Sequence, residues 1–562
     1  MKLKQQRLTL LAKIQLVAIL LAVCGNIVPW KAAAASFTAM TTPLPNNNFA
    51  PGHMLLLSDG RVMVQDYNSL NGWYFLLPDS NGHYISGNWS NCPSMTHTRL
   101  FYSSDILTNG NVFVAGAEIG SGSNNAELFD TTINRWTPVP VPANLLYNGP
   151  SGDSDNSQFR DSPSVLLSNG KVMIAPIFPA TNNATVIYDP VANTVSGGPI
   201  SLGDQNEACW VKLPDDSILT IDKDSTNSER FIPSLNKWIP DASLPVYLWS
   251  TNSEIGASLL LANGTVMSFG GTNSTAIYTP SPMGGTNIGS WVQGTNLPPG
   301  LVMRDAPSAV LNNGKLLLSF NEPTGDSPFH IYEYDPNTEA FTLVFTDDLE
   351  ISDQTSMVEL PDGTVLFNDT YTIYVYQPDV PPLPAGKPAI QSVSWNADGS
   401  LHLTGTLFNG ISQGAMYGDD AQQDSNFPLV RFTGGGNVYY GRTYNWSSTS
   451  VQTGSKSVAT ECTLPGNVLT NGLAAYSMQV VANGNASDAV TIYGPVWVDF
   501  NYSKLLPQLG TFANPYSTLG QGVTNVITGG TISIKPGVSS QTLLITKAMT
   551  INAIGGTATV GQ

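Results

Sequence analysis

The sequence predicts an all-β protein that consists of a seven-bladed β-propeller, an immunoglobulin-like β-sandwich and a short β-helix-like tail. The main observation is a phrase that occurs seven times, in which an apolar strand, a tight turn and a second apolar strand follow one another. The 52 Gly and 39 Pro residues, with a charged fraction of only 11%, agree with a turn-rich β protein. The pattern changes after Pro378, where the further domains begin.

The turns of the repeated phrase begin at Asp59, Asn109, Asn169, Asp215, Asn263, Asn313 and Asp362. Their spacing of 46 to 60 residues indicates a propeller of kelch type, because kelch repeats are about 50 residues long. Asn-Gly and Asp-Gly accept the positive φ angles that a two-residue hairpin turn requires. The fourth copy has Asp216 in place of the glycine, so we expect a strained turn there.

Each repeat continues with a third strand and an outer strand, and the outer strand begins at Trp136, Trp238 or Trp291 in three of the copies. The last repeat ends near Pro378 before an outer strand occurs. We therefore expect residues 36–44 to supply the missing strand. The propeller would then cover residues 36–379 and form a closed ring with few exposed edges.

The amino terminus has the layout of a cleaved secretory signal over residues 1–35, with basic residues, an apolar stretch at 14–28 and then four alanines. An uncleaved anchor is the alternative. The signal predicts a secreted or extracytoplasmic protein, at the cell surface or in the periplasm, with no stable membrane insertion after cleavage. The formal net charge of -18 argues against nucleic acid and against an anionic membrane as partners, because both would repel this chain.

Removal of the signal leaves three cysteines, Cys92, Cys209 and Cys462, which are far apart in the sequence. An odd number without a CxxC pair allows at most one internal disulfide. We expect buried free thiols rather than a zinc site.

Two further segments follow a Pro-rich connector after Pro378. Residues 388–499 contain seven short strands with tight turns between them, which is typical of an immunoglobulin-like sandwich. Residues 505–562 contain short β segments separated by Gly-Gly, like the first rungs of a right-handed parallel β-helix. We expect this tail to be weakly ordered alone, to dock on the sandwich, or to serve in surface attachment.

The repeated phrases and the carboxy-terminal sandwich together resemble the galactose oxidase and glyoxal oxidase superfamily. The most specific stretch is GTLFNGISQGAMYGDDAQQDSNFPLVRFTGGGNVYYGRTYNWSS. The resemblance implies that a seven-bladed propeller is followed by an early-set immunoglobulin-like domain. It also implies an oxidase with one copper ion, held by two tyrosines and two histidines, with one tyrosine cross-linked to a cysteine.

The positions that correspond to these copper ligands carry other residues. The Tyr-His pair of the family matches Asp353 and Gln354, the cysteine matches Phe101, and the cross-linked tyrosine matches Asp161. The stretch ISQGAMYGDDAQ, where the sandwich histidine would lie, contains no histidine. We therefore expect no copper, no other cofactor and no catalytic residue of the oxidase type.

Other metal sites have little support in the sequence. The five histidines are scattered, and isolated histidines in β proteins are usually surface or hydrogen-bonded core residues, so we predict no metal ligand among them. Asp419 and Asp420 form an acidic pair that could bind calcium, and a solvated turn is the alternative.

Alignment of the repeats on their turns predicts a ring of polar and aromatic residues at the inner mouth of the propeller. The ring contains Phe101, Tyr102, Arg160, Asp161, Glu207, Glu254, Arg304, Asp305, Asp353 and Gln354. Carboxylates accept hydrogen bonds from sugar hydroxyls and aromatic rings stack on sugar faces, so this ring favours binding of a glycan or cell-surface polysaccharide.

Two alternatives for the ring remain open. Arginine–aspartate pairs would tie neighbouring blades together in a purely structural or adhesive protein. Two carboxylates would also suit a glycan hydrolase or lyase. The sequence thus favours an exported binding or surface-interaction module without copper-radical chemistry, and the alternative is an enzyme in the acidic funnel, including a divergent oxidase.

Overall fold

The computed structural model describes residues 35–146, 159–160, 162–222, 225–250, 255–304, 306–323, 328–348, 354–413, 415–416, 426–465, 475–503 and 507–561. The predicted secretory segment lies outside these ranges, apart from Ala35. Within them, no helix combines the length and the apolar character that a membrane span requires.

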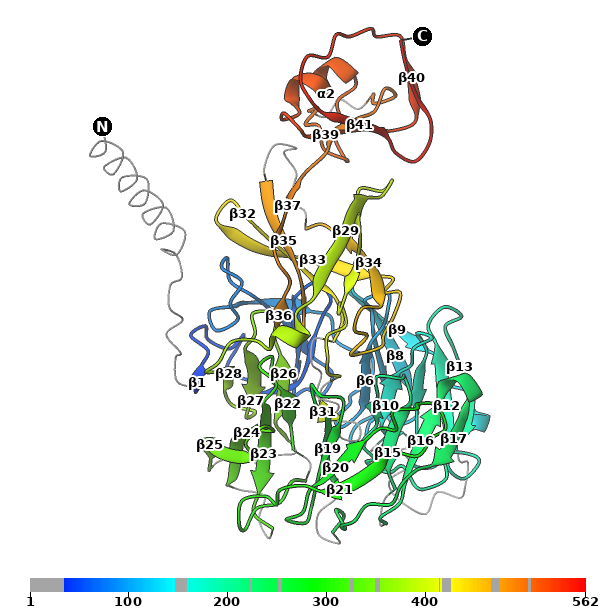
Figure 1. Ribbon diagram of the computed structural model, residues 1–562, viewed down its shortest axis with the longest axis vertical. Helices are drawn as coiled ribbons and strands as arrows, with labels where there is room; N and C mark the ends of the chain where they lie inside the picture. Colours follow the sequence, from blue (N-terminus) through cyan, green and yellow to red (C-terminus); the bar gives the residue numbers. More distant parts are fainter. Residues whose placement is uncertain are drawn as a thin grey trace, which may run out of the picture.

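The propeller contains seven sheets of four antiparallel strands, arranged as blades around an axis (Figure 1). Blade 1 consists of β2 (Pro51–Leu56), β3 (Val62–Asp66), β4 (Trp73–Leu77) and β5 (Asn88–Cys92). Blade 2 consists of β6 (Ser103–Ile106), β7 (Val112–Ala115), β8 (Ala126–Asp130) and β9 (Arg135–Val139). Blade 3 consists of β10 (Ser164–Leu166), β11 (Val172–Ile174), β12 (Ala184–Asp189) and β13 (Thr194–Ile200).

The remaining blades follow in chain order. Blade 4 consists of β14 (Val211–Lys212), β15 (Ile218–Ile221), β16 (Ser228–Ile232) and β17 (Lys237–Pro240). Blade 5 consists of β18 (Ile255–Leu260), β19 (Val266–Gly270), β20 (Ala276–Thr279) and β21 (Ser290–Gln293). Blade 6 consists of β22 (Ser308–Val310), β23 (Leu316–Asn321), β24 (Phe329–Asp335) and β25 (Ala340–Asp347). Blade 7 consists of β26 (Ser356–Glu359), β27 (Val365–Asn368), β28 (Ile373–Gln377) and β1 (Ser36–Ala39).

The ring closes as the sequence predicted. Strand β1 pairs antiparallel with β28, with Ser36 opposite Gln377, so the first strand of the chain is the outer strand of the last blade. Because the closure joins the two ends of the repeat, blade 7 cannot form without residues from the start of the propeller.

The hairpin turns also follow the prediction. Gly60 and Gly110 have φ angles of 78° and 77°, and the equivalent position in blade 4 is Asp216, with φ of 68°. A side chain in this left-handed region is strained, so the fourth turn carries a penalty that the others avoid.

Aromatic pairs fix the third strand of a blade to its outer strand. Phe129 lies opposite Trp136 with ring centroids 5.0 Å apart, and Tyr278 lies opposite Trp291 at 5.1 Å. Cross-strand aromatic contacts stabilise a sheet beyond the area that they bury. All three cysteines among the described residues, Cys92, Cys209 and Cys462, are buried free thiols, which confirms that prediction.

The second domain is a curled sheet of eight strands in the order β29-β30-β34-β33-β32-β35-β36, with β37 paired to β35. Its strands are β29 (Ala389–Trp395), β30 (Leu401–Thr406), β32 (Leu429–Gly434), β33 (Asn437–Tyr444), β34 (Ser457–Thr463), β35 (Ala475–Ala482), β36 (Asn485–Ala486) and β37 (Val490–Tyr493). Alternate residues such as Leu401, Leu403, Met478 and Val480 fill its core. We call it the sheet domain.

The sheet domain stands on one face of the propeller, over the hairpin turns that join the first two strands of the blades (Figure 1). The Ser58 hydroxyl donates to the Thr443 carbonyl at 2.8 Å, and the Gln452 amide donates to the Leu261 carbonyl at 2.7 Å. Strand β31 (Ala415–Met416) of this domain pairs with the inner strand β18 of blade 5. The two domains therefore share a sheet as well as a polar interface.

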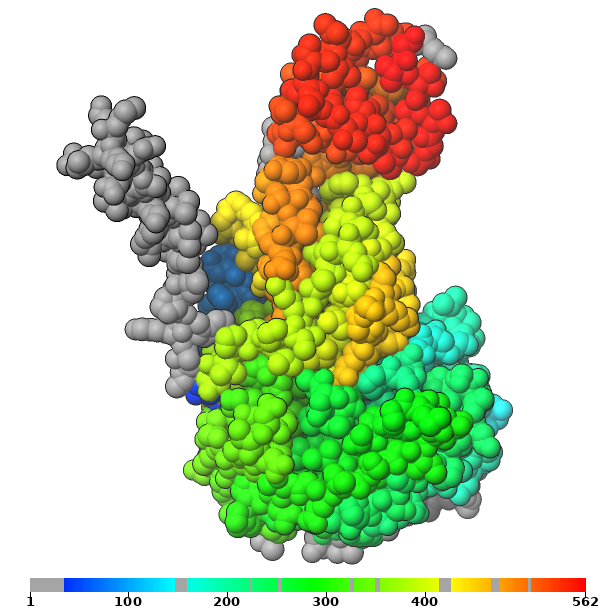
Figure 2. Space-filling model, in the orientation of Figure 1, coloured from blue at the N-terminus to red at the C-terminus, as the bar shows by residue number. Residues whose placement is uncertain are grey.

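The tail lies at the far end of the sheet domain from the propeller (Figures 1 and 2). It forms two parallel sheets, one of β38 (Val496–Val498), β39 (Thr531–Ile534) and β41 (Thr550–Ala553), the other of β40 (Gly537–Ser539) and β42 (Ala558–Val560). Helix α2 (Leu519–Asn525) packs on them and is capped by the Thr518 side chain. Strand β38 belongs to the range predicted for the sandwich but pairs with the tail. Three short 3₁₀ turns, η1 (Ala143–Leu145), η2 (Pro233–Leu235) and η4 (Pro384–Gly386), complete the described elements.

Candidate functional site

The structure has three candidate sites: the inner mouth of the propeller, a groove between the propeller and the sheet domain, and a buried cavity near the propeller axis. The mouth is the face opposite the sheet domain, because the inner strands start there and run toward the hairpin turns that contact the sheet domain.

The structure describes six of the ten predicted mouth residues. Phe101, Arg160, Glu207, Arg304 and Gln354 are partly buried and lie just before the inner strands of five blades, so the topology brings them to one end of the propeller. The other four, Asp161, Glu254, Asp305 and Asp353, lie outside the described residues, as do Asp419 and Asp420.

Tyr102 differs from its neighbours at the mouth because its ring is buried. Its hydroxyl donates to the Gln65 side-chain oxygen at 2.9 Å, and its ring contacts the His53 imidazole at 5.4 Å between centroids. Tyr102 therefore presents no face on which a sugar could stack. Burial lowers the pKa of His53 to about 4, so this imidazole is neutral at pH 7 and shares a hydrogen bond of 2.9 Å with the Ser104 hydroxyl.

Backbone strain marks two of the mouth residues. Phe101 and Glu207 have φ angles of 53° and 50°, and both precede the hairpin turn of their blade by eight residues. Non-glycine residues in this region are uncommon and concentrate at functional positions. Exposed aromatic rings lie on the same face, at Phe178, Tyr247 and Tyr371.

The copper site that the resemblance implies would require tyrosine, histidine and cysteine side chains at the mouth. Phe101 offers a phenyl ring and Gln354 an amide where the family has copper-centre residues, and neither group is a good ligand for copper(II). Across the described ranges, no three or more His, Cys, Asp and Glu side chains group so as to hold a metal ion. Phe101 and Gln354 therefore supply no good copper ligand, and the absence of a copper-radical centre stays a prediction because Asp161 and Asp353 lie outside the described residues.

The groove between blade 1 and the sheet domain has a volume of about 500 Å³. It is lined by Asp59, Arg61, Leu77, Pro78, Asp79, Ser80, Asn437, Val438, Tyr439, Tyr440, Arg442, Thr463, Leu464 and Pro465. We call it the interdomain groove. Its volume falls within the range of small-molecule sites, which occur preferentially between domains.

Hydrogen bonds hold the charged groups of the interdomain groove in place. The Arg61 guanidinium donates to the Asp59 carboxylate at 2.8 Å and stacks over the Phe75 ring at 4.1 Å. Arg442 Nε donates to the Thr131 hydroxyl at 2.9 Å. Burial raises the pKa of Asp79, but hydrogen bonds from Ser86 and from backbone N–H groups outweigh this effect and leave the pKa lowered. The groove thus has fixed acceptors and donors beside an apolar wall.

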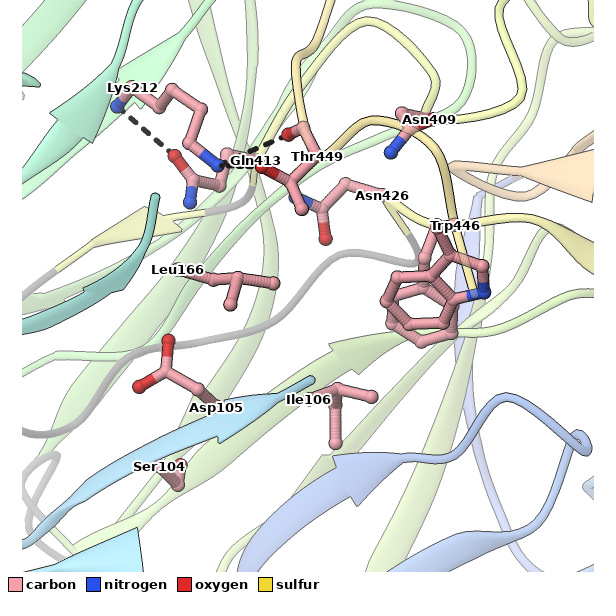
Figure 3. Close-up of a pocket in the computed structure, with 11 residues that line it drawn as sticks. Ser104, Asp105, Ile106, Leu166, Lys212, Asn409, Gln413, Asn426, Trp446 and Thr449 are labelled. Carbon is pink, nitrogen blue, oxygen red and sulfur yellow. Dashed lines mark hydrogen bonds between the residues drawn. The ribbon is translucent and has the colours of Figure 1, made fainter. Parts of the chain in front are cut away.

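The third place is a cavity of about 50 Å³ between the inner strands of the propeller and the sheet domain; Figure 3 shows the residues that line it. Asp105 enters it from β6 and Lys212 from β14, while Asn409, Gln413, Trp446 and Thr449 close it from the sheet domain. The Lys212 ammonium donates to the Thr449 carbonyl at 3.1 Å and to the Thr449 hydroxyl at 3.3 Å. We call it the axial cavity.

The sequence prediction missed both the interdomain groove and the axial cavity. Asp105 and Lys212 had a signal, because each is a charged residue inside an apolar inner strand where most other copies have an aliphatic side chain. The interdomain groove had no signal in the sequence. Tyr439 and Asp59 are 380 residues apart and both line the groove only because the two domains dock.

Comparisons with known proteins support no assignment. No protein-family model and no curated protein matches this sequence. Among solved structures, a copper-bound fungal alcohol oxidase of the AA5 family is 16% identical, with 80% of this chain and 85% of that chain covered and a TM-score of 0.34. A catalytically inactive virginiamycin B lyase from Staphylococcus aureus, in complex with quinupristin, is 11% identical, with 61% and 99% covered and a TM-score of 0.40. Similarity at this level carries no argument about function.

Proposed function

We propose that this protein is an exported glycan-binding module, with a kelch-type propeller and an immunoglobulin-like domain but without copper-radical chemistry, and that the interdomain groove is its glycan site. The observation that carries the proposal is a groove of about 500 Å³ that Tyr439 lines together with the Asp59–Arg61 pair and Asp79. Export rests on the layout of residues 1–35.

The apolar surface, hydrogen-bond donors and acceptors of the interdomain groove are complementary to those of a sugar. One face of a pyranose ring is apolar and stacks on an aromatic ring, while its hydroxyls need both donors and acceptors around the edge. Tyr439, Leu464 and Pro465 supply apolar surface. Asp79 supplies carboxylate oxygens and Arg442 supplies guanidinium N–H groups, and both are already oriented by the protein. Such pre-orientation reduces the entropy that binding costs.

The test is glycan-array screening of the mature protein, followed by calorimetry with the best oligosaccharide. We expect Tyr439→Ala to weaken binding about tenfold, which corresponds to about 1.4 kcal/mol, and Tyr439→Phe to retain it because the ring remains. Tyr371→Ala is the matched control, because Tyr371 is 64% exposed on the mouth face.

Other outcomes would contradict the proposal in different ways. If Tyr371→Ala abolishes binding and Tyr439→Ala does not, the glycan binds at the mouth, as the sequence predicted. If the array glycans are cleaved, the protein is an enzyme rather than a binding module. If no glycan is retained at any concentration used, the protein does not bind glycans.

A further inference from the structure

The axial cavity contains a lysine whose surroundings are unusual. The Lys212 side chain is only 1% exposed, and the hydrogen-bond partners of its ammonium are two neutral oxygens of Thr449. Burying a charge without a carboxylate partner is costly, so such a group persists only where its position has a use. The backbone is fixed as well, because the Lys212 N–H donates to the Gln413 side-chain oxygen at 3.0 Å.

A carboxyl group faces the same cavity. Asp105 is only 7% exposed, and its Oδ2 atom accepts no hydrogen bond from any described residue. The Oδ1 atom of Asn409, which also lines the cavity, is equally without a donor among the described residues. The Asp105 carboxylate and the Lys212 side chain therefore line the same cavity (Figure 3), and although the Ser164 hydroxyl and the Leu166 N–H also face the carboxylate, its Oδ2 atom keeps room for a further donor.

The space suits a very small ligand. A water molecule needs about 10–15 Å³ of cavity volume, so the 50 Å³ of the axial cavity holds about three to five waters, or a carbonyl compound of two or three carbon atoms. The walls of Ile106 and Leu166 and the stacked rings of Phe427 and Trp446 would accommodate its carbon atoms.

We propose that Lys212 binds a small aldehyde covalently as an imine in the axial cavity, with Asp105 as the proton donor and acceptor for this reaction. The site is separate from the interdomain groove and does not depend on glycan binding. It combines a desolvated amine, an acid and a water-sized space, which are the requirements for imine formation.

The reaction balances with these groups. No ion pair within 4 Å joins Asp105 and Lys212, so a cavity water carries the proton from the Lys212 ammonium to the Asp105 carboxylate. The free amine then attacks the carbonyl carbon while the C=O electron pair moves to oxygen. That oxygen takes a proton from nitrogen and gives a carbinolamine. The Asp105 carboxylic acid then protonates the hydroxyl, which leaves as water while the C=N bond forms. The products are a protonated imine, one water and the original carboxylate.

The protonation states are consistent with this reaction. Burial lowers the pKa of Lys212 to about 8, although Asp216 and Asp105 oppose the shift, and burial raises the pKa of Asp105 to about 6. About one tenth of Lys212 would be a free amine at pH 7, whereas an ordinary exposed lysine, with a pKa of about 10.4, has less than about 0.1%.

The test is reductive trapping of the full-length wild-type protein at pH 7 with acetaldehyde and cyanoborohydride, followed by peptide mapping. We expect ethylation of Lys212 to be at least about tenfold faster than that of the exposed Lys237 and Lys387. Faster labelling of Lys237 and Lys387 than of Lys212 would overturn the proposal, because it would show that Lys212 is only a structural ammonium. This comparison within one folded protein needs no variant.

Two variants test the roles of the individual groups. Lys212→Arg keeps the charge and a donor to Thr449, so it should fold but lose the trapped adduct. Asp105→Asn keeps the shape but removes the acid, and we expect at least about tenfold slower trapping at Lys212 with the melting temperature retained. An unchanged trapping rate in Asp105→Asn would remove Asp105 from the reaction and overturn the proposal as stated.

Discussion

At the scale of single residues, the hairpin turns show how a local rule is combined with a distant contact. Gly110 has a φ of 77° because its turn requires it, and a Cβ atom there would also lie 2.8 Å from the Ser58 hydroxyl and 2.8 Å from the Thr443 carbonyl. The first requirement is visible in the Asn-Gly sequence. The second arises from the neighbouring blade 1, which supplies Ser58, and from the docking of the sheet domain, which supplies Thr443.

We therefore predict that Gly110→Ala destabilises the protein by about 3 kcal/mol, of which about 1 kcal/mol comes from the φ angle and the rest from the clash at the domain interface. Gly300→Ala is the matched control, because Gly300 has a similar φ of 82° but no atom within 4 Å of the added Cβ. Gly300→Ala should cost only about 1 kcal/mol. Urea denaturation measures both variants, and equal losses would show that the interface clash is relieved without cost.

At the scale of elements, the blades repeat one strand pattern but not one set of partners. Glu127 on β8 and Glu229 on β16 occupy the third strand of their blades, and each accepts two backbone N–H groups from the connection before its inner strand. Glu127 also accepts a hydrogen bond of 3.0 Å from the Arg99 guanidinium, whereas Glu229 accepts one of 2.8 Å from the Gln205 side-chain amide. The two glutamates therefore have different charge environments.

This difference predicts that the same substitution destabilises the protein by different amounts at the two positions. Glu127→Gln removes the charge partner of the fully buried Arg99 and should destabilise the protein by about 3 kcal/mol. Glu229→Gln removes no cation partner in blade 4 and should cost about 1 kcal/mol or less at pH 7. Chemical denaturation at pH 7 compares the two variants, and a larger loss for Glu229→Gln would contradict the argument.

The pH dependence of the free energy of unfolding gives a second test of the environment of Glu229. Burial is the main reason that the pKa of Glu229 is raised from 4.5 to about 7, with the neighbouring Asp222 carboxylate adding to the effect. The folded state binds more protons than the unfolded state between about pH 4.5 and pH 7, so the free energy of unfolding falls as the pH rises through this window. In Glu229→Gln this contribution should be absent, and the rise in stability on acidification from pH 7 to pH 5 should be smaller than in the wild type.

At the scale of the whole molecule, the sequence was sufficient for the propeller because each blade is specified locally. The repeated turns set the strand boundaries, and the missing outer strand of blade 7 identified β1 as its replacement. The sites depend on long-range docking, which no local pattern encodes. Lys212 meets Thr449 across 237 residues, and Arg442 meets Thr131 across 311. The four mouth residues Asp161, Glu254, Asp305 and Asp353 stay predictions, because they lie outside the described residues.

The tail has strand edges that could mediate association between two copies of the protein. Strands β41 and β42 are the outer edges of the two parallel sheets described there, and all four residues of β41 are exposed. Natural proteins usually protect such edges with charges, yet residues 507–562 contain no Asp or Glu, and their two lysines, Lys535 and Lys547, donate to backbone carbonyls of the tail itself. Apolar side chains are exposed beside them, including Leu544 at 85%. Because the tail projects away from the acidic propeller (Figure 2), two tails can approach each other with little repulsion.

We predict that the protein self-associates reversibly through these edges as its concentration rises, and that Leu544→Lys weakens this association about tenfold by placing a charge beside β41 and β42. Val191→Lys is the matched control, because Val191 is 97% exposed on a propeller turn and its substitution changes the net charge equally. Sedimentation velocity over a range of concentrations measures the effect. A protein that stays monomeric throughout, or a control that weakens association as much as Leu544→Lys, would show that the tail edges do not pair and that net charge alone governs any association.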